Sequence, residues 1–116
     1  MQQEKRKEKR YMVRGRALAL VSPNNIMPFQ ILDISRSGLA FSYNGTEDWG
    51  NELLELELFD DEDFYLDQIP IKIISDIPVD DTSHALRRCG VQFGELSPNQ
   101  QALLEYFIQK HTVGIA

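Results

Sequence analysis

The sequence predicts a mainly β fold, with about six short antiparallel strands and one helix at the carboxy terminus, arranged as a small barrel or sandwich. Apolar residues alternate with polar ones over several short segments, as in strands with one buried face. Turn signals separate these segments, among them residues 22–25 (SPNN) and Asn44-Gly45. A helical pattern appears only after residue 97.

The strands can be placed in order from this alternation. The run Leu54, Leu56, Leu58 alternates with Glu55 and Glu57, which predicts a strand with one buried and one solvated face. Similar reasoning applies to the other segments. The six expected strands are residues 11–21, 27–33, 39–43, 54–58, 69–73 and 89–93.

The helix has a clear start. Ser97 is expected at the N-cap, Pro98 at the first helical position, and Gln100 in a capping box with Ser97. The helix should end near residue 111. Its apolar stripe should close one end of a barrel or cover one face of a sheet, and comprises Leu103, Leu104, Phe107 and Ile108.

Length and composition indicate a single soluble domain. A chain of 116 residues can bury a core without disulfides or a metal. The single cysteine, Cys89, excludes an internal disulfide, favours a reducing compartment, and is expected to be inert within a buried strand. The start of the chain has no apolar run, so we expect no signal peptide, no membrane insertion and a cytoplasmic location.

Charge is distributed unevenly along the chain. Residues 1–16 hold seven basic and two acidic residues, whereas the remainder holds five basic and sixteen acidic ones. We expect residues 1–10 to form a mobile basic arm and residues 11–116 to form the domain. The arm favours an anionic partner, but the acidic body would repel duplex DNA. A small, multiply phosphorylated ligand fits both, although a solvated tail or a weak nucleic-acid-binding arm is an alternative.

The stretch DISRSG, residues 33–38, interrupts a strand pattern with polar residues and a glycine. Such residues favour turns, because their side chains bond to nearby backbone and glycine reaches positive φ without strain. The stretch is therefore expected to connect two antiparallel strands. It leaves Asp33, Ser35 and Arg36 as candidate ligand-binding residues, and the alternative is a turn with a side-chain cap.

No catalytic or metal-binding pattern is present. The two histidines, His84 and His111, are far apart in sequence and lack cysteines at metal-binding spacing. The acidic run at residues 60–63 lacks the spacing and glycine of an EF-hand, and is expected to be a solvated loop. Glu55 and Glu57 are expected to be surface charges. The sequence therefore predicts no enzyme and no metal site.

Two motifs together resemble the PilZ domain, whose signature is RxxxR followed by [D/N]xSxxG. The first half is Arg6 and Arg10, directly before the first strand, and the second half is residues 33–38. Residues 89–93 (CGVQF) look like the late barrel strand of that family. The resemblance covers nearly the whole chain. Arg10 and Arg14 form an alternative RxxxR pair, but Arg14 falls inside the expected first strand.

The resemblance implies a six-stranded antiparallel β-barrel of the split-barrel type with a C-terminal α-helix, which binds cyclic di-GMP as a ligand and needs no cofactor. The arginines would bind phosphate and stack on purines, while the turn would read a guanine edge. Binding would order the arm and signal to an unidentified effector protein. The implied ligand-binding residues are Arg6, Arg10, Asp33, Ser35, Arg36 and Gly38.

Two other functions remain as alternatives. One is a PilZ-like protein–protein interaction module that does not bind the nucleotide. Some family members carry an aromatic residue that packs against the ligand. Ser75 stands near the corresponding place here, so this stacking contact would be absent. The other alternative is an RNA- or DNA-binding barrel, which the acidic body disfavours.

Overall fold

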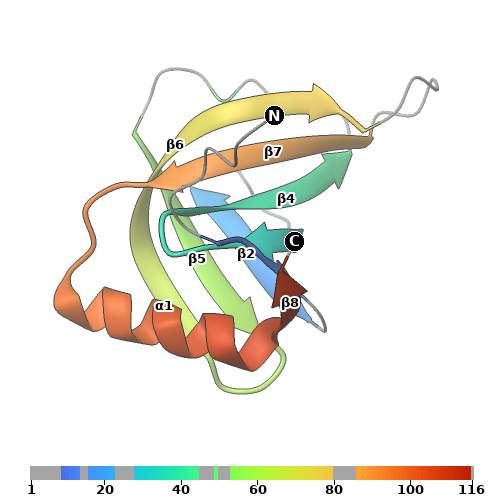
Figure 1. Ribbon diagram of the computed structural model, residues 1–116. Helices are drawn as coiled ribbons and strands as arrows, with labels where there is room; N and C mark the ends of the chain where they lie inside the picture. The colour runs from blue at the N-terminus through green and yellow to red at the C-terminus, as the bar shows by residue number, and fades with distance from the viewer. Residues whose placement is uncertain are drawn as a thin grey trace, which may run out of the picture.

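The computed structural model describes residues 9–13, 16–22, 28–44, 49, 53–79 and 86–115. These residues form eight strands and one helix (Figure 1). In chain order the elements are β1 (Tyr11–Val13), β2 (Ala17–Ser22), β3 (Phe29–Ile34), β4 (Gly38–Asn44), β5 (Leu54–Asp60), β6 (Tyr65–Pro78), β7 (Leu86–Phe93), α1 (Pro98–His111) and β8 (Thr112–Ile115).

Six of the strands close into a barrel. Their order is β2-β5-β6-β7-β4-β3, and β2 also pairs with β3, so the sheet returns to its start. All these pairs are antiparallel. This confirms the predicted six-stranded barrel. Closure pairs the backbone groups that the edge strands of an open sheet would leave without partners.

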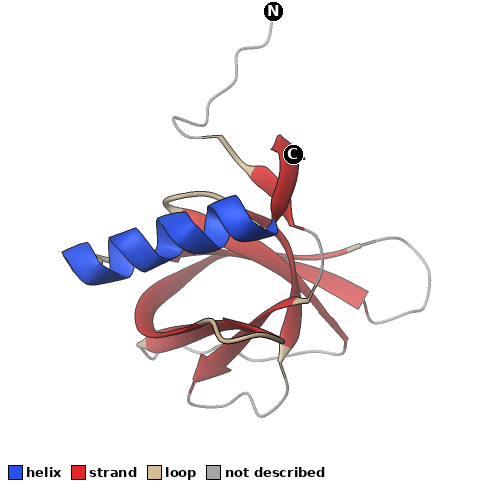
Figure 2. Ribbon diagram, turned by 90° about the horizontal axis from the view of Figure 1, so that it is seen from below, coloured by secondary structure: helices blue, strands red, loops and turns tan. Residues whose placement is uncertain are grey.

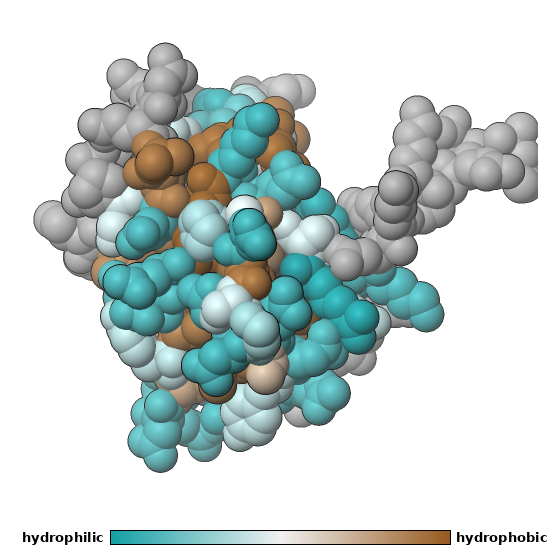
Figure 3. Space-filling view, turned by 90° about the vertical axis from the view of Figure 1, so that its left-hand side faces the viewer, coloured by the Kyte–Doolittle hydropathy of each residue, from teal (hydrophilic) through white to brown (hydrophobic). Residues whose placement is uncertain are grey.

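The barrel interior is apolar, as the alternation predicts. Leu54, Leu56 and Leu58 are buried, whereas Glu55 is exposed. Cys89 is fully buried, and burial, followed by the nearby Asp76 charge, raises the pKa of its thiol to about 12. The prediction that Cys89 lies in the buried core is therefore confirmed. Figure 3 shows hydrophilic residues over most of one outer face, with hydrophobic residues between them.

The prediction of one continuous strand from residue 11 to residue 21 is wrong. Tyr11 of β1 stands opposite Ile34 of β3, whereas Leu18 of β2 stands opposite Gln30. The chain therefore advances seven residues from Tyr11 to Leu18, while their partners on β3 are only four residues apart. The excess falls between the two short strands, where Arg16 forms an exposed bend.

Strand β8 was not predicted from the sequence. Residues 112–115 follow α1 directly and pair with β1 on the side away from β3, so Tyr11 faces Ile115. A four-residue strand that directly follows a helix is too short to show an alternating pattern.

The capping box is present as predicted. The Gln100 amide donates to Ser97 Oγ at 3.1 Å, and Gln100 Oε1 accepts from the Ser97 amide at 3.0 Å. The Gln100 side-chain nitrogen also donates to the carbonyls of Asp67 and Gln68, both at 3.1 Å. Gln68 has a φ of 59°, so Gln100 fixes the helix start against an irregular part of β6. The helix lies along one end of the barrel (Figures 1 and 2) and buries Leu104, Phe107 and Ile108.

The acidic run at residues 60–63 is only partly the solvated loop that was predicted. Asp61, Glu62 and Asp63 are exposed, but Asp60 is buried. Its carboxylate accepts from His111 Nε2 at 2.8 Å and from Lys110 Nζ at 3.0 Å. Asp60 Oδ1 accepts from the amides of residues 62 and 64. Asp60 therefore joins the β5–β6 turn to the end of α1.

A second carboxylate, that of the partly buried Asp76 of β6, joins three parts of the chain. It accepts hydrogen bonds from the Tyr43 hydroxyl at 2.6 Å, Trp49 Nε1 at 3.0 Å and Arg87 Nε at 2.9 Å. Burial alone raises the pKa of Asp76, but these hydrogen bonds hold it below its usual range. Through these bonds Asp76 links β4, β6 and β7 to Trp49.

Candidate functional site

The turn at residues 33–38 connects β3 and β4, as predicted. The Ser35 amide donates to the Gly38 carbonyl at 2.8 Å, and the Ser35 hydroxyl donates to the same carbonyl at 3.3 Å. The Ser37 amide in turn donates to Ser35 Oγ at 3.2 Å. Ser35 is only 2% exposed. Its hydroxyl therefore holds the turn together from inside.

Gly38 is required for space rather than for a positive φ. It has extended strand backbone at the start of β4. A Cβ atom at this position would lie 2.2 Å from the Val91 carbonyl oxygen of β7. No other residue allows so close an approach of the two strands. A backbone hydrogen bond from the Phe93 amide to the Ser37 carbonyl, 2.8 Å, holds the turn against β7.

Asp33 lies at the centre of a charged cluster. Its Oδ1 is 3.1 Å from Arg10 Nη1, and its Oδ2 is 2.5 Å from Arg88 Nη2. β1 brings Arg10 to this place, because Met12 stands opposite Asp33 in the β1–β3 pair. Asp33 is 7% exposed, and the two arginine side chains are 19% and 33% exposed. The cluster therefore lies at the surface of the barrel, with its arginines accessible.

Small residues surround the charged cluster on the same row of the sheet. Asp33 stands opposite Ala40 of β4, Ala40 opposite Gly90 of β7, and Gly90 opposite Ser75 of β6. Residues directly opposite one another share a face of the sheet. A Cβ at Gly90 would lie 2.6 Å from Ser75 Oγ, so a larger residue there would require the Ser75 side chain to move. These small residues allow Arg88 to reach across β4 to Asp33.

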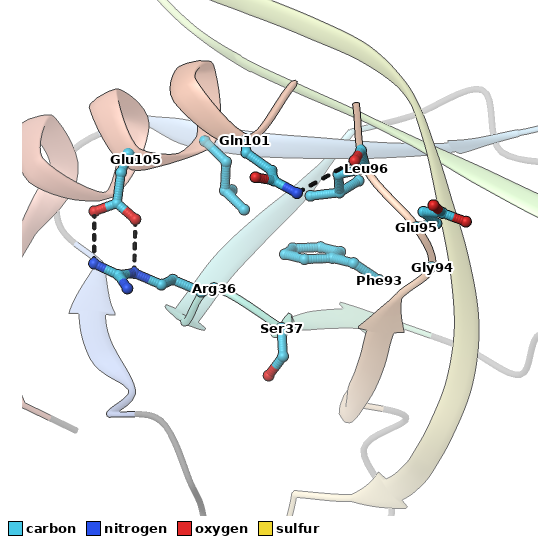
Figure 4. Close-up of a pocket in the computed structure, with 9 residues that line it drawn as sticks. Arg36, Ser37, Phe93, Gly94, Glu95, Leu96, Gln101 and Glu105 are labelled. Atoms are coloured by element: carbon cyan, nitrogen blue, oxygen red, sulfur yellow. Dashed lines mark hydrogen bonds and ion pairs between the residues drawn. The ribbon is translucent and has the colours of Figure 1, made fainter. Parts of the chain in front are cut away.

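Arg36 points away from Asp33. Its Nε lies 2.6 Å from Glu105 Oε2, and its Nη2 lies 3.3 Å from Glu105 Oε1, which links the turn to α1. This pair borders a hollow of about 480 Å³ between the turn and the helix (Figure 4). The structure thus brings Asp33 and Arg10 together but places Arg36 on the other side of the turn. Arg6 and Arg14 lie outside the described residues.

Comparison with known proteins identifies the family. A sequence model of the PilZ domain matches residues 4–110. The chain belongs to the PilZ domain family. No curated protein sequence matches this PilZ domain.

Solved structures share its fold. The complex of K. pneumonia MrkH with c-di-GMP has a TM-score of 0.72 and 19% sequence identity, and the match covers 93% of this chain and 52% of MrkH. B. subtilis MotI (DgrA), an inhibitor of motility, has a TM-score of 0.68 and 18% identity over 95% of this chain and 52% of MotI. The c-di-GMP-bound PilZ domain of E. coli YcgR has a TM-score of 0.67 and 15% identity over 92% of this chain and 91% of that domain. The chain thus spans about half the length of MrkH and MotI.

Arg88 of this PilZ domain was not among the site residues predicted from the sequence. The alternation of β7 does indicate that Arg88 points away from the buried side chains of Cys89 and Val91. Its partner is 55 residues away in the sequence and two strands away in the sheet, so only the topology shows the contact. Arg87 points the opposite way, to Asp76.

The PilZ domain combines a locally cationic cluster with an acidic body. Two guanidinium groups face one carboxylate at Asp33, whereas residues 17–116 hold five basic and sixteen acidic residues. No group of three or more histidine, cysteine or acidic residues that could hold a metal ion occurs among the described residues. Within the same residues, no helix is long and apolar enough to cross a membrane.

Proposed function

We propose that this PilZ domain is a receptor for cyclic di-GMP, which binds over the Asp33 cluster on the outside of the barrel. The observation that carries the proposal is the placement of Asp33 between Arg10 and Arg88 at the end of β3. Cyclic di-GMP offers two phosphates to cations and two guanine edges to acceptors. The cluster contains both kinds of group within one small area.

The arginines are proposed to bind the phosphates and the purine faces. A guanidinium forms paired hydrogen bonds with phosphate oxygens and stacks on flat aromatic rings. Arg10 and Arg88 are each partly exposed and can make such contacts without unfolding the barrel. Arg6, the first arginine of the family motif, is proposed to join them from the arm.

Asp33 is proposed to read guanine. A carboxylate oxygen accepts two hydrogen bonds, so each oxygen of Asp33 retains acceptor capacity beside its arginine partner. Guanine presents adjacent donors at its ring N1 and exocyclic amine. Ser35 and Gly38 are proposed to set the turn that orients Asp33, and the small residues Ala40 and Gly90 lie in the same row of the sheet as Asp33.

Signalling is proposed to follow from the arm. The part of residues 1–10 that carries Arg6 would become ordered over the bound nucleotide and change the surface presented to an effector protein, whereas Arg10 already contacts Asp33. The family membership supports this proposal, as do the c-di-GMP complexes of MrkH and YcgR, which share the fold. Binding without any chemical step accounts for all the residues assigned here.

An NMR titration of the ¹⁵N-labelled protein with cyclic di-GMP tests the proposal. We expect saturable shifts centred on the amides of Arg10, Asp33 and Arg88, and slower backbone motion in residues 1–10 once the ligand is bound. Shifts centred on β5 or α1, or the absence of saturable shifts, would contradict the proposed site. Unchanged motion in residues 1–10 with the expected shifts would remove the ordering of the arm but keep the site.

A further inference from the structure

The hollow between the turn and α1 has a floor and a rim of different chemistry. Its floor includes Phe93 and Leu104, which are 8% and 3% exposed, and the partly buried Leu96. Its lining also includes two acidic residues, Glu95 and Glu105, and the Glu105 carboxylate faces Arg36 (Figure 4). An apolar floor with a few polar groups at its edge is the usual composition of a binding pocket.

A cation of the same chain, the Arg36 guanidinium, pairs with the Glu105 carboxylate at this hollow. Arg36 makes a two-point contact with Glu105, and it is the only basic residue among those that line the hollow. The two side chains are 69% and 41% exposed. Exposed ion pairs contribute little to stability, so a stronger anion can displace Glu105 from Arg36.

We infer that this hollow is a docking site for a partner segment in which an arginine or lysine adjoins an apolar side chain, and that Arg36 occupies it until cyclic di-GMP binds. The control of this docking site by cyclic di-GMP rests on the proposed function, whereas the docking site itself does not. Arg36 lies three residues after Asp33 in the same turn, and its side chain is 69% exposed, so little packing opposes its movement away from Glu105. A phosphate attracts a guanidinium more strongly than an exposed carboxylate does.

Charge selects the partner. When Arg36 leaves, Glu95 and Glu105 remain with no cation among the lining residues. A basic partner group then replaces Arg36 on Glu105, and its apolar neighbour enters the floor. An acidic partner would meet two carboxylates, and like charges at an interface oppose association. Nucleotide binding would thus free the Glu105 carboxylate, which pairs with Arg36 in the free protein.

The turn connects the two places mechanically as well. Ser37, between Arg36 and Gly38, accepts the backbone hydrogen bond from Phe93, whose ring forms part of the floor. Gln101 Nε2 donates to the Leu96 carbonyl at 3.3 Å, which holds the loop before α1 in place. The floor is therefore preformed, and only the Arg36 side chain has to move.

The test is an NMR titration of the full chain with acetyl-Leu-Arg-Leu-amide, with acetyl-Leu-Glu-Leu-amide as the charge control. For the wild type we expect the basic peptide to bind about twofold to fivefold more tightly when cyclic di-GMP is present, because the exposed Arg36–Glu105 pair no longer competes with it. Arg36→Ala should bind it as tightly without the nucleotide. Glu105→Gln should lose most of this affinity, whereas Glu57→Gln, a charge removal on β5, should not.

Three results would overturn the docking site: no tighter binding by Arg36→Ala than by the wild type, equal binding of the acidic peptide, or peptide shifts away from residues 93–105. The Arg36→Ala measurement needs no nucleotide, so it decides the docking site separately. If cyclic di-GMP does not bind at all, the proposed function and the gating are both refuted. If it binds but leaves the peptide affinity unchanged, the gating alone is refuted.

Discussion

At the scale of single residues, two neighbouring arginines on β7 contact different carboxylates on different sides of the strand. Arg88 faces Asp33 on the outside, whereas Arg87 bonds to Asp76 in the barrel wall. Arg88→Ala should weaken cyclic di-GMP binding about tenfold, the loss of one charge-assisted hydrogen bond, and leave the unfolding midpoint nearly unchanged. Arg87→Ala should lower the midpoint and leave affinity nearly intact. Calorimetric titration and thermal unfolding of both variants check this, and the reverse pattern would contradict the site.

Asp33 should determine which base is accepted. Adenine has an acceptor at its ring N1, which would face the carboxylate with no proton between them, so wild type should prefer cyclic di-GMP to cyclic di-AMP. A site with unpaired polar atoms rejects an analogue that lacks the matching groups. Asp33→Ala should lose guanine affinity about tenfold and narrow the difference between the two ligands. Titrations of both nucleotides measure it, and equal wild-type affinities would show that phosphate contacts dominate.

Local chemistry made part of this site predictable from sequence. The turn at residues 33–38 could be identified because its side chains bond within four residues, as Ser35 does to Gly38. The reason for Gly38 was not predictable, since it depends on the Val91 carbonyl of a strand distant in sequence. The Arg88–Asp33 contact and the Arg36–Glu105 pair were missed for the same reason.

At the scale of elements, Gln100 should contribute to stability through more than its cap. Gln100→Ala removes the bond from the Ser97 amide and the two bonds to the carbonyls of Asp67 and Gln68. We expect a loss of about 1–2 kcal/mol in the free energy of unfolding. Gln109→Ala, an exposed substitution on the same helix, is the control and should change it by less than about 0.5 kcal/mol. Denaturant unfolding measures both, and equal effects would contradict this role.

Asp60 should make the junction of the β5–β6 turn and α1 sensitive to acid. Burial raises the pKa of its carboxyl, but hydrogen bonds from the Glu62 amide, His111, Lys110 and the Phe64 amide outweigh burial and hold the pKa well below its usual range. A carboxyl with a lower pKa in the folded state stabilises the protein above its unfolded pKa, about 4. This stability is lost as the pH falls through the folded value.

Asp60→Asn tests this acid dependence. The difference in unfolding free energy between wild type and Asp60→Asn should be largest near neutral pH and should shrink steadily below about pH 4. Asp63→Asn, in the exposed part of the same run, should show little difference at any pH. Denaturant unfolding across this range is the measurement. A difference that grows on acidification would contradict the assigned direction.

Regular patterns made most of the elements predictable, and tertiary pairing decided the rest. The six barrel strands and the capped helix follow from alternation and from Ser97 and Gln100. The break between β1 and β2 was missed, although residues 14–16 read Arg-Gly-Arg and an isolated glycine in a strand pattern can mark an irregularity. The register with β3 shows the break directly. The burial of Asp60 depends on His111, 51 residues away.

At the scale of the whole molecule, the charge distribution favours a small anion over a polymer. The Asp33 cluster carries two guanidinium groups against one carboxylate, within a chain whose net charge is −6. A compact ligand with two phosphates contacts the cluster without covering much of the acidic surface. A long nucleic acid would extend over that surface and be repelled. The central claim is therefore that cyclic di-GMP binds through this local cluster.

Calorimetric titration of cyclic di-GMP into wild type, Arg10→Ala and Arg16→Ala tests that claim most directly. Both substitutions remove one arginine from the amino-terminal region, but Arg10 contacts Asp33 whereas Arg16 lies in the exposed bend before β2. We expect saturable binding to wild type, a loss of about tenfold to a hundredfold for Arg10→Ala, and little change for Arg16→Ala. No binding to wild type, or equal losses in the two variants, would contradict the account.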